Sequence, residues 1–226
     1  MAKKSSRRKS SRQSQRKTNW TVIYGVIAAG VILLGGLLYL SLQTGEIVTI
    51  PIRCEDDAAL CVTKGEANAP VTIVEILDFG CNHCQAFHQE TAPLIDAQYV
   101  ENGDVKFVMY PYALSGNTLP GTNAALCAEE QDAYFAFTDA LFDQFGQPDY
   151  LTSESIIRAG ETAGVEMTSF TQCVSEGRYN DVIQENMSVA RNNRINSTPN
   201  FFVNGEKLEG NQPFSIFQQR IESYLN

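Results

Sequence analysis

Two cysteines separated by two residues give the strongest chemical signal in this sequence. They lie in the segment Cys81-Asn82-His83-Cys84, after a short apolar run and at the start of a helical pattern. The first turn of a helix offers unpaired N–H groups and a partial positive charge, which favour a thiolate on Cys81. Cys84, one turn later, can open or close a disulfide with Cys81, and His83 adds a possible cation beside the thiolate. The spacing therefore predicts thiol–disulfide exchange.

Half of a zinc site or a structural bridge is the alternative interpretation of such a cysteine pair. Zinc usually takes four ligands, and although His83 and His88 lie nearby, no second Cys-x-x-Cys segment completes a tetrahedral set. His88 is expected to be a packed or half-exposed helix residue rather than a catalyst. The sequence has no evident phosphate-binding loop, Ser-His-Asp pattern or paired-acid site. We therefore expect neither a metal nor a cofactor.

The segments around the cysteine pair predict a strand, a helix and a second strand. Val71 to Leu77 is short, apolar and rich in β-branched residues, as in a buried strand. Apolar residues recur at helical spacing from Cys81 to Val100, with a kink expected at Pro93. Val105 to Tyr110 is the second strand. This order is typical of the crossover unit of a parallel sheet.

The second half of the chain predicts a helical block and then a hairpin. Asn204-Gly205 follows the apolar Phe201 to Val203, which is a strong hairpin signal, and Phe214 to Leu225 is expected to be an amphipathic helix. The helical block, from about residue 122 to 193, interrupts an otherwise compact α/β arrangement. Its expected helices are Ala124 to Gln131, Ala133 to Phe145, Ser153 to Ala163 and Thr168 to Glu176.

The N-terminal region has the charge pattern of a membrane anchor. Residues 1–19 hold eight Lys or Arg and no acid, whereas all 26 acids lie after residue 42. Residues 20–42 are uncharged and mostly apolar, and as a helix they would span roughly 34 Å, close to a hydrocarbon core of about 30 Å. We predict a basic cytoplasmic tail, residues 1–19, and a single transmembrane helix that acts as a signal-anchor, residues 20–42. A linker over residues 43–68 and a domain over 69–226 would then lie on the extracytoplasmic side.

Two alternatives for this N-terminal region are weaker. A cleavable signal peptide would have an apolar region of about 7 to 15 residues followed by a small-residue cleavage site, and Ser41-Leu42-Gln43 fits that pattern poorly. A basic tail can also bind nucleic acid, but beside an apolar segment it indicates membrane topology. We expect no nucleic-acid partner.

The cysteines suit an oxidising compartment. All six, at positions 54, 61, 81, 84, 127 and 173, follow the apolar segment, and disulfides persist outside the cytoplasm. Spacing alone allows fifteen connectivities. We expect Cys54 and Cys61 to bridge each other, either as a structural disulfide or as a relay that passes electrons onward.

Four segments together resemble the DsbA-like branch of the thioredoxin superfamily. They cover about residues 65 to 226, and their order and spacing carry the match. The resemblance implies a thioredoxin-like α/β fold with an inserted α-helical domain at about residues 120–193, here preceded by the predicted transmembrane helix. It also implies dithiol–disulfide exchange with exported proteins. The segments are Ala69-Pro70-Val71-Thr72-Ile73-Val74-Glu75, Asp78-Phe79-Gly80-Cys81-Asn82-His83-Cys84, Cys127-Ala128-Glu129-Glu130-Gln131 and Ser197-Thr198-Pro199-Asn200-Phe201-Phe202-Val203-Asn204-Gly205.

The resemblance also implies roles for residues outside the cysteine pair. Pro199 would be a proline in cis that faces the redox pair, with Thr198 before it, rather than an ordinary turn proline. Glu75 would be a buried acid that relays a proton to or from Cys84, although a strand acid that simply reaches solvent is the alternative. Cys127 and Cys173 would form a structural disulfide within the helical domain.

The predicted function is that of a membrane-anchored oxidase. It would donate its Cys81–Cys84 disulfide to unfolded or folding exported proteins and be reoxidised by a membrane redox partner. An isomerase or reductase on the same scaffold is the alternative, and a membrane-tethered metal-binding module is a third.

Overall fold

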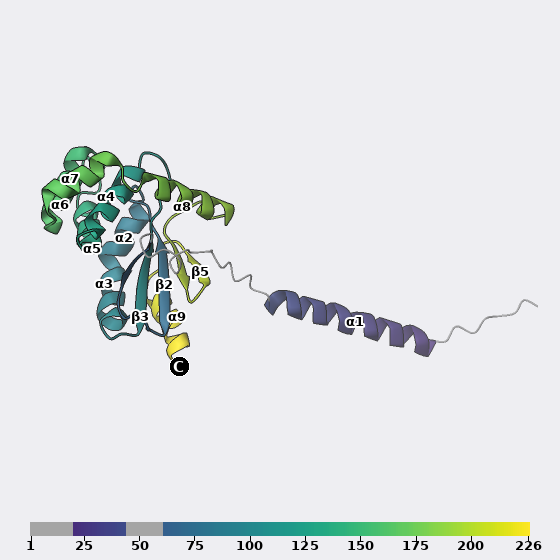
Figure 1. Cartoon of the computed structure of the whole chain (residues 1–226). Coiled ribbons are helices and arrows are strands. Elements are labelled where there is room, and N and C mark those ends of the chain that lie inside the picture. The colour runs from purple at the N-terminus through teal and green to yellow at the C-terminus, as the bar shows by residue number, and fades with distance from the viewer. Residues whose placement is uncertain (1–19, 44–60) are drawn as a thin grey trace, which may run out of the picture. The chain divides into compact units, whose positions relative to one another are not determined.

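The computed structural model describes residues 20–43 and 61–226, which belong to two separate units of the chain. The first contains the single helix α1 (Trp20–Gln43), at the place where the sequence predicts a transmembrane helix (Figure 1). Within the described ranges, however, no helix has both the length and the apolar character that crossing a membrane requires. The transmembrane helix over residues 20–42, and the single-pass anchor with it, are therefore not supported. The predicted basic tail and most of the predicted linker lie outside the described residues.

The second unit is built on a five-stranded mixed sheet with the order β1-β3-β2-β4-β5. Central β2 pairs in parallel with β3, which confirms the predicted crossover, and antiparallel with β4. Asn204-Gly205 forms the turn of the predicted hairpin, between β4 and β5. The strands are β1 (Val62–Lys64), β2 (Val71–Ile76), β3 (Val105–Tyr110), β4 (Asn200–Val203) and β5 (Glu206–Glu209).

β1 is a strand that the sequence assigned to the linker over residues 43–68. It has three residues, Val-Thr-Lys, too few for an alternating pattern to be recognised. It forms through its pairing with β3, antiparallel from Val62 opposite Met109 to Lys64 opposite Phe107. The ordered domain therefore begins before residue 69.

The crossover from β2 to β3 consists of three short helical segments where one kinked helix was expected. α2 (Asn82–Glu90) ends at Thr91, α3 (Ala92–Ile95) follows, and the π-helical segment η1 (Asp96–Val100) completes the crossover. Pro93 lies in the first turn of α3. Proline has no N–H and fits the first turn of a helix, where that donor would be unpaired. The helix therefore breaks before Pro93, and α2 is a separate short helix that begins at the cysteine pair.

Five helices separate β3 from β4, and a sixth closes the chain. Figure 1 shows α4, α5, α6 and α7 gathered beside α2. Only four helices were predicted in this block, and α8 was missed. It is a mostly polar helix whose buried residues are Ile183, Asn186, Met187 and Ala190. The helices are α4 (Leu119–Glu129), α5 (Tyr134–Phe142), α6 (Ser153–Ala163), α7 (Met167–Glu176), α8 (Asn180–Asn192) and α9 (Phe214–Leu225).

An aromatic cluster fixes α2 on the sheet. The ring of Phe87, fully buried on α2, lies 4.5 Å from that of Phe201 on β4 and 5.4 Å from that of Phe217 on α9. Phe107 on β3 stacks on it at 6.3 Å. Aromatic pairs at such distances add about 0.5–1.5 kcal/mol each beyond the area they bury. This packing holds α2, and the cysteines at its start, in a fixed position relative to β2 and β4.

Candidate active site

Cys81 and Cys84 lie at the start of α2, one turn apart. Cys81 is the N-cap residue, with extended backbone angles, and its N–H donates to the carbonyl oxygen of Asp78 at 3.0 Å. Both cysteines are free thiols here. Cys81 is partly exposed whereas Cys84 is completely buried. Only the first sulfur is therefore accessible to an incoming peptide.

The loop that presents Cys81 is organised by the buried carboxylate of Asp78. Its Oδ1 accepts the N–H of Gly80 at 2.8 Å, and its Oδ2 accepts the N–H of Leu114 at 2.6 Å and the hydroxyl of Thr118 at 2.5 Å. The sequence analysis gave Asp78 no role of its own. The available signal was an acid directly after an apolar strand and three residues before Cys81, a position where a carboxylate commonly accepts backbone hydrogen bonds.

The two thiols have very different acidities. The hydrogen bond from the Cys84 thiol is the main cause that lowers the pKa of Cys81 to about 5, with smaller contributions from Thr198 and from the backbone N–H groups of Cys84 and His83. Burial only partly opposes this effect. Burial is also the main cause that raises the pKa of Cys84 well above its ordinary value, followed by the Cys81 sulfur and the negative charge of Glu75. Near neutral pH, Cys81 is thus a thiolate and Cys84 a thiol.

The cation predicted at His83 stays a prediction, and the contact that the structure gives this residue with the thiolate is through its backbone. His83 is exposed, and its backbone N–H is one of the groups that lower the pKa of Cys81. At the second position of α2, the N–H of His83 points back toward the N-cap sulfur, and the residue is exposed to solvent.

Thr198 and Pro199 meet the cysteine pair from the far end of the chain. The peptide bond between them is cis, and the Sγ of Cys81 lies 3.3 Å from the carbonyl oxygen of Thr198. The side-chain amide of Asn200 donates to the carbonyl of Ser197 at 2.6 Å and holds this loop where β4 begins. The backbone before Pro199 therefore borders the reactive sulfur, where an extended peptide could pair with it.

Glu75 lies beneath the pair on β2 and is fully buried. The alternative, that its carboxylate reaches solvent, is wrong. Its Oε2 lies 3.1 Å from Nε2 of His88, itself buried on α2, while its Oε1 has no hydrogen-bond partner within the described structure. The packing of His88 was predicted from the sequence, but this contact was not. The signal for it was the placement of His88 one helical turn after Cys84, on the face that packs against the strand.

Two of the remaining cysteines form a disulfide in the helical region. Cys127 on α4 and Cys173 on α7 are bonded, with their Cα atoms 5.8 Å apart. Cys61 is disulfide-bonded as well, but Cys54 lies outside the described residues, so the Cys54–Cys61 pair stays a prediction. Over residues 20–43 and 61–226, no three His, Cys, Asp or Glu side chains gather as they would around a metal ion.

Comparison with known proteins places this geometry in a family. Residues 61–223 match the family model described as thioredoxin. The chain is 24% identical over 174 residues to the disulfide bond formation protein D of Bacillus subtilis strain 168, a match that covers 71% of this chain and 75% of that protein. It is 23% identical over 148 residues to a putative protein-disulfide oxidoreductase of Rickettsia typhi, which covers 64% of this chain and 55% of that protein.

Solved structures share the fold. The crystal structure of alpha-DsbA1 from Wolbachia pipientis superposes with a TM-score of 0.65 at 24% identity, covering 72% of this chain and 89% of that one. This agrees with the DsbA-like fold expected from the sequence. The thioredoxin family model matches most of the chain, and the cysteine pair and the cis-proline loop lie inside the match. The chain therefore belongs to the thioredoxin family.

Proposed function

We propose that this protein donates the Cys81–Cys84 disulfide to exported proteins, as a thiol–disulfide oxidoreductase working on the extracytoplasmic side. The observation that carries this proposal is the difference in acidity between an accessible and a buried thiol at one helix start. The cis-proline loop adds a backbone edge beside the accessible sulfur. The relatives named for disulfide bond formation and protein-disulfide oxidoreduction support the same reaction.

The geometry assigns each sulfur a step in this reaction. A substrate thiolate attacks Sγ of Cys81, because Sγ of Cys84 is buried. The disulfide between the two cysteines breaks, and Cys84 leaves with the electron pair and takes up a proton. A second substrate thiolate then attacks the substrate sulfur of the mixed disulfide, and Cys81 leaves as a thiolate. The substrate loses two electrons, which the cysteine pair gains.

The low pKa of Cys81 favours oxidation of the substrate over its reduction. A stable thiolate is a good leaving group and stabilises the reduced enzyme, so that the disulfide is a strong oxidant. Each turnover leaves the pair reduced, and a further redox partner must accept two electrons. We assign this step to a membrane redox protein, as the DsbA-like resemblance implies.

The reduction potential of the full chain tests the direction of transfer. Equilibration with glutathione should give a value well above the roughly −270 mV of thioredoxin and closer to the roughly −120 mV of a strong oxidant. Oxidised protein should form a disulfide in a reduced two-cysteine peptide, and Cys81→Ser should abolish this activity. With the oxidised form of the same peptide, Cys84→Ser should accumulate the mixed disulfide, because the Cys81 thiolate attacks the peptide disulfide, releases one peptide thiolate, and has no Cys84 thiol to resolve the product. A potential near that of thioredoxin would instead support the reductase alternative, and repair of scrambled disulfides without net oxidation would support an isomerase.

A further inference from the structure

Cys84 must gain and lose a proton in every catalytic cycle, although its side chain has no exposed surface. On the substrate side, Cys81 and the carbonyl of Thr198 lie next to each other. A bound peptide would cover that side further. A route for this proton that avoids the substrate side would keep proton transfer independent of substrate binding.

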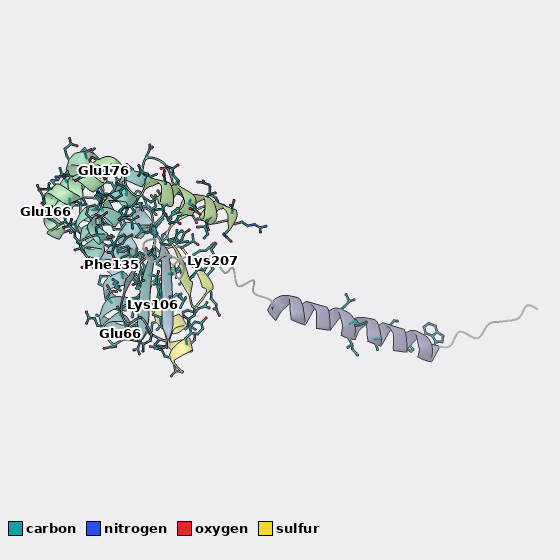
Figure 2. All side chains as sticks on the ribbon, in the orientation of Figure 1. Glu66, Lys106, Phe135, Glu166, Glu176 and Lys207 are labelled. Atoms are coloured by element: carbon teal, nitrogen blue, oxygen red, sulfur yellow. A yellow bond between two sulfur atoms is a disulfide. The ribbon has the colours of Figure 1, made fainter. Side chains whose placement is uncertain are left out.

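A cavity of about 510 Å³ is lined by residues of α2 from the end of the helix distant from Cys81. Its walls come from α2, α3, η1, α5 and β1, and Phe135, labelled in Figure 2, is one of its aromatic residues. Polar residues at its rim include exposed Asp143 and Gln89. The cavity is therefore in contact with solvent. His88 is among the residues that line it.

His88 joins this cavity to the buried Glu75. Its Nε2 lies 3.1 Å from Oε2 of Glu75, and its side chain is 7% exposed. The rings of Phe87 and Phe142, with centroids 5.6 Å and 5.2 Å from that of the imidazole, restrict its orientation. The second oxygen of Glu75 has no partner in this part of the chain, and the negative charge of Glu75 is one of the causes that raise the pKa of Cys84. Ionisable groups thus follow one another from solvent to the buried sulfur.

We propose that His88 carries the proton that Cys84 gains and loses, exchanging it with water in the cavity and with Cys84 through Glu75. The assignment rests on the proposed function and adds a positioning and proton-transfer residue to it. When the disulfide opens, Cys84 accepts a proton from the Glu75 carboxyl, which takes one from the imidazolium of His88, which takes one from water. When the pair is reoxidised, the proton returns along the same groups and leaves Cys84 as the thiolate that displaces the bound partner from Cys81.

The ionisable side chains around the cavity are mostly acidic. Asp139 approaches from α5, Asp143 from directly after it, and Asp96 from η1, while Lys64 on β1 forms an ion pair with Asp96. With that pair neutralised, the carboxylates of Asp139 on α5, of Asp143 directly after α5 and of Glu75 leave the surroundings of His88 negative. Burial raises the pKa of Asp139, although the positive charge of His88 lowers it in turn.

Chemical rescue tests the proposal in the full chain. The rate at which reduced enzyme is reoxidised by oxidised glutathione is measured by stopped flow from pH 5 to 9 for the wild type, His88→Ala, His88→Gln and the control Gln89→Ala. Gln89 is the next residue on α2 and lines the same cavity, but it cannot titrate. We expect both His88 variants to be slowed about tenfold or more, within the range of general acid–base effects, and Gln89→Ala to change less than twofold.

Added imidazole should restore most of the rate to His88→Ala, because the cavity admits it, and should have no effect on the double variant Glu75→Gln/His88→Ala. Alkylation of Cys81 should keep its wild-type pH dependence in the single variants, which shows that the start of α2 is intact. If His88→Ala fails to fold, His88→Gln preserves the hydrogen bond to Glu75 without a titrating group. Wild-type rates in His88→Gln, or slow rates in His88→Ala that imidazole leaves unchanged, would overturn the relay. Loss of peptide oxidation in Cys81→Ser alongside such a result would leave the proposed function standing.

Discussion

Cys81 and Cys84 are chemically identical residues three positions apart, and their surroundings lower the pKa of the first thiol and raise that of the second. At the N-cap position, the sulfur of Cys81 accepts hydrogen bonds from the backbone N–H groups of the first turn and from the Cys84 thiol. Burial and the charge of Glu75 keep Cys84 protonated. Nucleophile and resolving thiol are thereby distinguished before any substrate binds. Two predictions follow from this difference at the residue scale.

Removal of Cys84 should raise the pKa of Cys81. The Cys84 thiol is the largest cause that lowers this pKa to about 5, so Cys84→Ala should move it upward by more than one unit, while Cys84→Ser, which keeps a donor, should move it less. The thiolate absorbance at 240 nm measures the titration, and Cys81→Ser provides the baseline without a titrating sulfur. An unchanged titration in Cys84→Ala would show that the helix start alone sets the acidity.

Acid should selectively destabilise the reduced form. Because folding lowers the pKa of Cys81 from 9.0 to about 5, its ionisation stabilises the reduced fold fully above pH 9, and this contribution disappears as the pH falls through about 5. The urea midpoint of the reduced wild type should therefore exceed that of reduced Cys81→Ser at pH 7.5, and the two should converge near pH 4. A difference that stays constant with pH would contradict this origin of the stabilisation.

At the scale of elements, the active site is a junction between β2, α2 and the loop before β4. The helix supplies its N-terminus, and the strand places Glu75 beneath it. The Thr198–Pro199 loop delivers its carbonyl from 117 residues farther along the chain. Asp78 closes this junction, since its carboxylate joins the loop before α2 to the segment before α4.

Replacement of Asp78 should loosen this junction. Asp78→Ala removes the carboxylate that accepts three hydrogen bonds. We expect it to lower the free energy of unfolding by about 3 kcal/mol, since hydrogen bonds to charged groups contribute about 1.5–3 kcal/mol each and do not add fully. Urea unfolding of the oxidised protein measures the loss. Glu101→Ala, at an exposed position, is the control and should change stability by less than about 0.5 kcal/mol. A loss equal to that of the control would mean that the three hydrogen bonds are dispensable.

At the scale of the whole domain, a helical region inserted between β3 and β4 is fastened to itself by the Cys127–Cys173 disulfide. The bonded residues are 46 positions apart and both are completely buried. Gln131 and Glu166 also join α4 to the start of α7, with the side-chain oxygen of Gln131 accepting the N–H of Glu166 at 2.6 Å. The redox pair lies at the start of α2, outside this helical region. The structural and the reactive sulfurs are therefore on different elements.

Loss of this disulfide should weaken the fold without altering the redox chemistry. A bridge with this separation contributes up to about 4 kcal/mol in the chain-entropy model, so Cys127→Ala/Cys173→Ala should lower the unfolding free energy by about 2–4 kcal/mol. The titration of Cys81 near pH 5 should remain. Urea unfolding without added reductant and the absorbance at 240 nm measure the two properties. A shifted Cys81 titration would instead show that the helical region controls the start of α2.

The sequence by itself determined the local elements and the kind of chemistry. The strand Val105–Tyr110 and the helices Ser153–Ala163 and Phe214–Leu225 have the predicted bounds, because their patterns depend on near neighbours and on the period of the backbone. The cysteine spacing indicated the reactive pair for the same reason. The short β1, the break before Pro93 and the polar α8 were missed, since packing on other elements specifies them more than their own residues do.

Only the tertiary structure decided which groups meet at the sulfurs. The contact of Thr198 with Cys81, the burial of Cys84 and the pairing of His88 with Glu75 join residues on different elements. The exposure of His83 also depends on the orientation of α2. A thiol pKa depends on burial, nearby charges and hydrogen bonds, and all three arise from packing between segments that are distant in the chain.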